Sequence, residues 1–235
     1  MSFQTPPPPP PGYGAPMPPV PNSGWSIGNA LSYGWTKFQA NVGQILLTAL
    51  VLFVGIGVVY GVMFAITAAV GSDSFVLSLV LLSLTIGVVI VAAQLIGAGL
   101  IRGALDVTEG RPFLMSSAFK FADVGKVLVT ALIIGGLSFV GFLLCYLPGV
   151  IVAFATSYAM YFVVDKNMEP VDAVKASVDL VRSRLGDTIL WWLVAAVVGS
   201  IGGCLCGVGA LVTYPIALIG TAYTYKHLTG QPVAP

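Results

Sequence analysis

The nonapeptide VGQILLTAL at residues 42–50 recurs as VGKVLVTAL at residues 124–132, and in weaker form as LGDTILWWL at residues 185–193. Each copy opens a long apolar segment and follows a shorter amphipathic one; the first of these carries Ile27, Leu31, Trp35 and Phe38. Apolar residues at three- and four-residue steps predict an amphipathic helix, and an apolar run of roughly 20 residues predicts a membrane-spanning helix. The repeat therefore predicts three units, each an in-plane amphipathic helix followed by a helical hairpin.

Composition indicates a membrane protein, because 57% of the residues are apolar and only 8% are charged, against about 25% charged in a soluble protein. The apolar runs are continuous and do not alternate with polar residues, which favours helices over a β-barrel. We therefore expect an all-α integral membrane protein with about six transmembrane helices. The expected spans are Ile45–Val70, Phe75–Ile101, Val127–Leu147, Val150–Val164, Thr188–Gly202 and Val208–Tyr225. Pro148-Gly149 and Gly202-Gly203 are expected to separate the last two pairs of spans, for which re-entrant hairpins are an alternative.

The distribution of cations predicts the orientation. All ten Lys and Arg residues lie before the first span, between spans two and three, between spans four and five, or after span six. The turns on the other side carry a single charge, that of Asp73. Because cytoplasmic loops retain Lys and Arg, we expect both termini to be cytoplasmic. No basic segment followed by a short apolar core and a cleavage site begins the chain, so no removable signal peptide is expected.

Residues 1–24 form a proline-rich region of their own. Proline fixes φ and lacks an amide donor, so we expect a disordered or polyproline II cytoplasmic tail. The tail could bind an SH3-like or WW-like groove or self-associate, or serve only as a spacer. Residues 25–228 are then the polytopic membrane domain, and residues 229–235 are a short cytoplasmic C-terminal tail. The candidate partner-binding residues are Pro6, Pro7, Pro8, Pro9, Pro10 and Pro11.

Two further features lie in or next to the spans. Cys145, Cys204 and Cys206 map to the outer ends of spans three, five and six, where Cys145 could form a disulfide with Cys204 or Cys206 in an oxidising exterior; free thiols are the alternative. Gln94 is the most polar side chain deep in a span. We expect it to hydrogen-bond a neighbouring helix, with contact to a permeating solute as the alternative.

The sequence contains no pattern typical of an enzyme. There is no HExxH, GxSxG, P-loop or dinucleotide fingerprint, and three cysteines without a nearby His or carboxylate make a poor metal site. No charged residue lies inside a span as drawn, which argues against ion-coupled transport, and a net charge of +1 argues against nucleic acid. The carboxylates of residues 165–187 alternate with cations and apolar residues, which predicts a solvated, charge-balanced face. We expect no catalytic, cofactor-binding or metal site.

Two stretches resemble known families. NALSYGWTKFQAN at residues 29–41 resembles the opening of small actinobacterial polytopic membrane proteins with a Pro/Gly-rich N-terminal tail. LPG at residues 147–149, VD at 164–165 and PVDAVKAS at 170–177 are similar to the membrane domain fused to some glycerophosphodiester phosphodiesterases. The resemblance covers most of residues 25–226 and implies a multi-pass protein of the bacterial plasma membrane. The catalytic phosphodiesterase domain has no counterpart here, so nothing catalytic carries over.

The expected function follows from these features. We expect a non-enzymatic scaffold or accessory subunit of a membrane complex, in contact with membrane lipids and with another membrane protein or a second copy of itself. The GxxxG pairs in the spans would let helices approach closely, within one subunit or between two. The alternative is a transporter or a lipid-handling protein that uses the space between the units.

Overall fold

The structure is a computed structural model and describes residues 24–70, 75–116, 123–144, 146–204 and 209–235. The regular structure of these residues is entirely helical, which confirms the expected all-α class. Within these described ranges, four helical segments are long and apolar enough to cross a membrane, namely Ile27–Ile66, Val124–Leu144, Tyr146–Lys166 and Leu185–Gly202. The helices are α1 (Ile27–Val70), α2 (Phe75–Thr108), α3 (Val124–Leu144), α4 (Tyr146–Ala155), α5 (Ala159–Lys166), α6 (Pro170–Ser183), α7 (Leu185–Cys204) and α8 (Ala210–Leu228).

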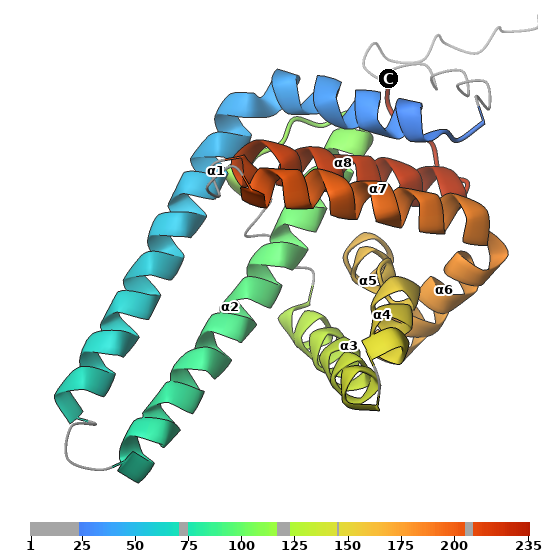
Figure 1. Cartoon of the computed structure of the whole chain (residues 1–235). Helices are drawn as coiled ribbons and strands as arrows, with labels where there is room; N and C mark the ends of the chain where they lie inside the picture. Colours follow the sequence, from blue (N-terminus) through green and yellow to red (C-terminus); the bar gives the residue numbers. More distant parts are fainter. Residues whose placement is uncertain (1–23, 71–74, 117–122, 145, 205–208) are drawn as a thin grey trace, which may run out of the picture.

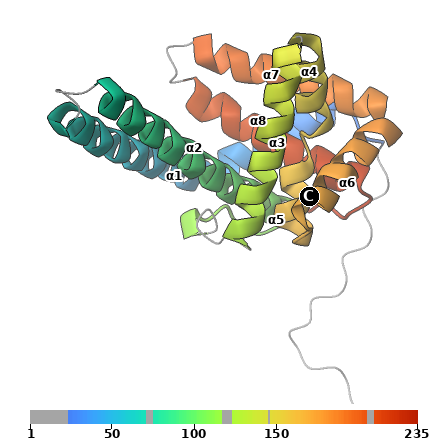
Figure 2. The same ribbon diagram turned by 90° about the horizontal axis from the view of Figure 1, so that it is seen from below.

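Three helical hairpins, α1–α2, α3–α4 and α7–α8, extend from a common base. The first part of α1 lies along α8, and its later part bends away to run beside α2 (Figure 1). The α1–α2 and α3–α4 hairpins point in different directions, and a view from below shows their tips far apart (Figure 2). The main hydrophobic core lies in the base, where Phe38, Leu105, Val163, Ala173 and Tyr225 are buried together. Burial is thus concentrated at one end of the hairpins.

The three copies of the nonapeptide share one pattern of burial. The fourth and seventh residues of each copy are at most 4% exposed, whereas the ninth is at least 50% exposed. Each copy therefore packs the same helix face toward the protein and turns the same face outward, since residues three apart lie on one face of an α-helix. The buried pairs are Ile45 and Thr48, Val127 and Thr130, and Thr188 and Trp191; the exposed ninth residues are Leu50, Leu132 and Leu193.

The three helices that run back to the base, α2, α5 and α8, share one kind of C-terminus. Gly110 follows α2, Asn167 follows α5 and Gly230 follows α8, each with φ between 50° and 79°. A left-handed residue just past the last turn is a common way to end a helix, and it suits glycine and asparagine. A proline follows two or three positions later in each case and prevents the helix from resuming directly.

The fourth expected span, Val150–Val164, is not one helix. α4 ends at Ala155 and α5 begins at Ala159, so the span is broken at residues 156–158. Ser177 of α6 fills the break: its hydroxyl donates to the Ala155 carbonyl at 2.8 Å and accepts from the Tyr158 amide at 3.1 Å. Backbone groups freed by a broken helix require such partners away from water. The segment Tyr146–Lys166 is still long and apolar enough to cross a membrane, but the break within it was not predicted, because the side chain that contacts the break lies on another helix.

The two dipeptides that were expected to separate spans, Pro148-Gly149 and Gly202-Gly203, lie inside helices instead. Pro148 and Gly149 were expected to break the chain, but both lie inside α4, where a proline in the first turn costs no hydrogen bond. Gly141 and Gly149 instead allow the two helices of the α3–α4 hairpin to pack closely, because a Cβ on Gly141 would lie 2.9 Å from the Gly149 Cα. Gly202 and Gly203 likewise lie inside α7 rather than after it.

Candidate functional site

The ends of α2, α5 and α8 meet at a buried cation, Lys226. Its ammonium group lies 2.8 Å from an oxygen of Asp165 and 2.9 Å from an oxygen of Glu109. It also donates to the side-chain carbonyl of Gln231 at 2.8 Å. An ammonium group has three N–H donors, so each donor has an acceptor, and Lys226 is only 3% exposed.

The same groups surround the carboxylate of Asp165, whose side chain is 7% exposed. One oxygen accepts from Lys226, and the other accepts from the Tyr225 hydroxyl at 2.9 Å and from the Gln231 amide at 3.0 Å. A buried charge is tolerated only when it is both paired and hydrogen-bonded. These contacts meet that requirement for Asp165 and Lys226 together.

Two arginines extend this ion cluster toward the surface. Arg111 pairs with both Glu109 and Asp106, and Arg102 pairs with Asp106 at 3.2 Å, one turn earlier on α2. Their side chains are partly exposed, at 50% for Arg111 and 33% for Arg102. With Lys226 and Asp165, the ion cluster contains three cations and three carboxylates and is therefore balanced.

The C-terminal residues cover one side of the ion cluster. The Ala234 amide donates to the carbonyl of Thr108, the last residue of α2, at 2.8 Å. The Ala234 carbonyl accepts from the Tyr33 hydroxyl of α1 at 3.0 Å. With the contacts of Gln231, these bonds attach residues 229–235 to the base through α1, α2 and α8. The arrangement is mutually saturated, which suits a structural joint better than a reaction centre.

The sequence-based expectation of solvated carboxylates is wrong for Asp165. It is right for Glu169 and Asp172, whose side chains are 66% and 62% exposed. Asp165 differs from them because it lies at the end of a return helix, as Glu109 and Lys226 do. That shared position, within four residues of each left-handed cap, is the signal in the sequence that could have identified the ion cluster.

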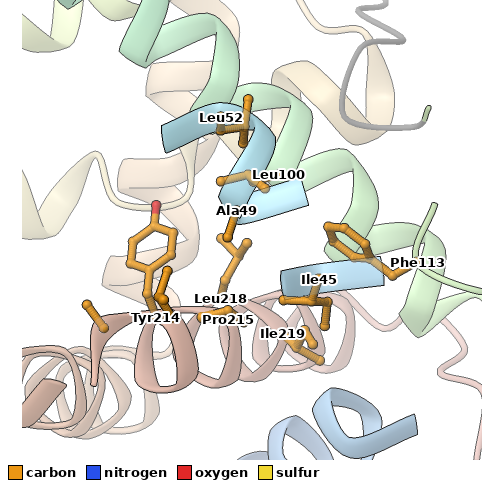
Figure 3. Close-up of a pocket in the computed structure, with 11 residues that line it drawn as sticks. Ile45, Ala49, Leu52, Leu100, Phe113, Tyr214, Pro215, Leu218 and Ile219 are labelled. Atoms are coloured by element: carbon orange, nitrogen blue, oxygen red, sulfur yellow. The ribbon is translucent and has the colours of Figure 1, made fainter. Parts of the chain in front are cut away.

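An apolar cavity of about 300 Å³ lies between α1, α2 and α8 (Figure 3). Its walls combine side chains from the middle of α1, one residue of α2, one residue after α2 and the first half of α8. Tyr214 is the one lining residue with a polar side-chain group, among the residues that the structure describes. The lining residues are Ile45, Ala49, Leu52, Leu100, Phe113, Ala210, Leu211, Tyr214, Pro215, Leu218 and Ile219.

Neither of the two described residues singled out in the sequence, Gln94 and Cys204, lines the cavity or belongs to the ion cluster. Gln94 is exposed on α2, and Cys204 is the last residue of α7. Cys145, Cys206 and the proline run Pro6–Pro11 lie outside the described residues. The possible disulfide, the inter-helix contact of Gln94 and the partner-binding tail therefore stay predictions. In the described part of the chain, no group of three or more His, Cys, Asp or Glu residues could hold a metal ion.

Comparison with known proteins finds relatives in mycobacteria. Over 96% of its length the chain is 35% identical to an uncharacterized protein of Mycobacterium bovis, 74% of which is covered. The same identity and coverage hold for uncharacterized proteins of two strains of Mycobacterium tuberculosis. No family model matches the sequence, and no solved structure matches it.

Proposed function

The chain belongs to the same family as these mycobacterial proteins, and from that premise we propose that it is a non-enzymatic scaffold or accessory subunit of a complex in the bacterial plasma membrane. It crosses the membrane several times and keeps both termini in the cytoplasm. Its partners are membrane lipids and either another membrane protein or a second copy of the chain.

One observation carries this proposal: the hairpins stand apart and expose large apolar side chains. On α3 the side chains of Leu132, Phe139, Leu143 and Leu144 are 68–76% exposed. On α1, Val58 and Phe64 are 59% and 63% exposed. Soluble monomers rarely expose contiguous apolar surfaces of this kind, whereas in a bilayer such faces meet lipid or other helices. Separate hairpins therefore offer free helix faces on which partner helices can pack.

The base supplies the rigidity that a scaffold requires. The ion cluster joins α2, α5 and α8, while Ser177 fixes α6 against the broken helix α4–α5. The amphipathic α6 buries Ala173 and Leu180 and turns Asp172 and Lys175 outward. We place this base at the cytoplasmic surface of the membrane, where exposed charges are solvated and apolar hairpins can enter the lipid.

We further propose that the hairpins form three units with the same in-and-out topology in the membrane and six spans in all. The shared burial of the three nonapeptides supports this arrangement, as do the left-handed residues that end α2, α5 and α8. Each unit then comprises an in-plane helix, an outgoing helix and a return helix. Units with the same topology lack the inverted symmetry found in many secondary transporters, which favours the scaffold function.

The test is to identify what the protein binds in its own membrane. The full chain is crosslinked in the native membrane, extracted in a mild detergent, and analysed by size-exclusion chromatography with mass detection. A defined partner or a defined homo-oligomer is the expected result. A variant lacking residues 1–24 separates partners held by the proline-rich tail from partners held by the hairpins. A lone monomer from both proteins would contradict the proposal.

The apolar cavity favours a second candidate, a lipid-handling or transport protein. Lipid transfer or solute flux is measured in vesicles that contain the purified protein, with an Ala49→Phe variant, which fills the cavity, for comparison. Rates equal to those of empty vesicles would exclude this candidate.

A further inference from the structure

We propose that the cavity between α1, α2 and α8 binds one acyl chain of a membrane lipid. This goes beyond the scaffold function and rests on it only in requiring that the chain lies in a membrane. The proposal concerns the hydrocarbon of the lipid and involves no particular headgroup.

The chemistry of the walls selects hydrocarbon. A buried water molecule needs two to four polar partners, and the described lining provides one hydroxyl, that of Tyr214. Polar ligands are normally oriented by several well-placed polar groups, and the cavity lacks such a set among its lining residues. A volume of about 300 Å³ is also far larger than the voids that remain in packed protein interiors. The single hydroxyl, the lack of a set of polar groups and the large volume all fit an apolar ligand.

The two ends of the cavity differ in exposure. At the base end, Ile45, Phe113 and Ile219 are at most 4% exposed and close the cavity. At the other end, Leu211 and Tyr214 line the cavity and are also 41% and 51% exposed on the outer surface of α8. The cavity therefore opens toward an apolar outer surface rather than toward the charged base.

The surroundings of the opening identify the source of the ligand. Ala49 faces the cavity from α1, while its neighbour Leu50 is 59% exposed on the outer side of the same helix. α1 includes a segment long and apolar enough to cross a membrane, so its outer side faces acyl chains. A chain from the surrounding lipid can enter at Leu211 and Tyr214 and fill the space up to Ile219 without desolvating any charge.

The experiment uses the full-length protein in phosphatidylcholine vesicles that contain a phosphatidylcholine with a photoreactive diazirine in one acyl chain. After irradiation, labelled residues are located by proteolysis and mass spectrometry. We expect labelling of two cavity residues, the partly buried Leu218 and the buried Ile219, in addition to that of exposed residues. Ala49→Phe, which fills the cavity, should reduce labelling at Leu218 and Ile219 about tenfold, as expected from the loss of roughly two methylene contacts. Leu50→Phe adds a ring at the adjacent outward position and should leave that labelling unchanged.

Three results would overturn the proposal. Labelling of Leu218 and Ile219 could be absent while exposed residues are labelled, or it could persist in the Ala49→Phe variant. If Ala49→Phe does not yield a monodisperse protein, Ala210→Phe fills the cavity from α8 and is judged by the same criteria. If no residue is labelled, even on the exposed face of α1, the protein is not in the bilayer, and the membrane assignment fails together with the acyl-chain site.

Discussion

The ammonium group of Lys226 lies 2.8 Å from the carboxylate of Asp165, although 61 residues separate them in the chain. The same ammonium group also contacts Glu109, which is 117 residues away. One side chain thus joins the ends of α2, of α8 and of α5, the helix that follows the α3–α4 hairpin. The hairpins diverge beyond this point, so their relative positions depend on the contacts at the base.

Replacing Lys226 with alanine should destabilise the base strongly. The substitution leaves Asp165 buried without its cation, and removal of one partner of a buried ion pair costs about 3–5 kcal/mol. Lys175→Ala serves as the matched control, because Lys175 is 71% exposed and its ion pair with Asp172 spans 3.8 Å. The control should change the free energy of unfolding by less than about 0.5 kcal/mol. Both values are measured by denaturant titration in mixed micelles, and equal effects would show that the ion cluster does not hold the base together.

The sequence predicts the class of this fold well because that class depends on local patterns. Long apolar runs and three- or four-residue periodicity are visible within one segment, and they identify the helices and the hairpins. The nonapeptides at residues 42–50, 124–132 and 185–193 are also visible as a repeat in the sequence, and the structure gives all three the same pattern of burial. Such patterns need no knowledge of which segments meet in space.

The ion cluster and the cavity were not predictable in this way. Lys226 looked like an ordinary basic residue at a helix end, because its partners Glu109 and Asp165 are remote in sequence. The cavity depends on how far α1 and α8 stand apart, which no periodicity encodes. The break between α4 and α5 is hydrogen-bonded by Ser177, a residue that by itself resembles any small residue on an amphipathic helix. Each of these features is formed by contacts between segments that are far apart in the sequence.

The role of Ser177 can be tested by Ser177→Ala. The Ala155 carbonyl and the Tyr158 amide would both lose their partner in a site where Ser177 is fully buried. An unsatisfied buried polar group costs about 1–3 kcal/mol, so the unfolding midpoint should fall clearly. Ser183→Ala removes the hydroxyl of an exposed serine on the same helix and should have little effect. If the two variants were equally stable, the break would not depend on Ser177.

Two glycines with different surroundings, Gly220 in α8 and Gly136 in α3, should respond differently to replacement by alanine. A Cβ on Gly220 would lie 2.5 Å from the Trp191 ring, and that ring is fixed by a hydrogen bond from its nitrogen to Thr221 at 3.0 Å. Gly220→Ala should therefore cost about 1–3 kcal/mol through overpacking. Gly136 in α3 has no atom within 4 Å of its added Cβ, so Gly136→Ala should be neutral or stabilise by up to about 1 kcal/mol. Thermal unfolding of both variants measures the difference, and a stable Gly220→Ala protein would refute the packing argument.

The proposed orientation predicts opposite labelling at the two ends of the molecule. In a variant without native cysteines, Tyr146→Cys lies at the tip of the α3–α4 hairpin and Ser183→Cys at the end of α6 in the base; both positions are exposed. Because loops rich in Lys and Arg stay in the cytoplasm, a membrane-impermeant maleimide added to intact cells should label residue 146 and spare residue 183. Inside-out vesicles should give the reverse pattern. Labelling of residue 183 from outside would place the base, with its ion cluster, on the external face and would invert the proposed topology.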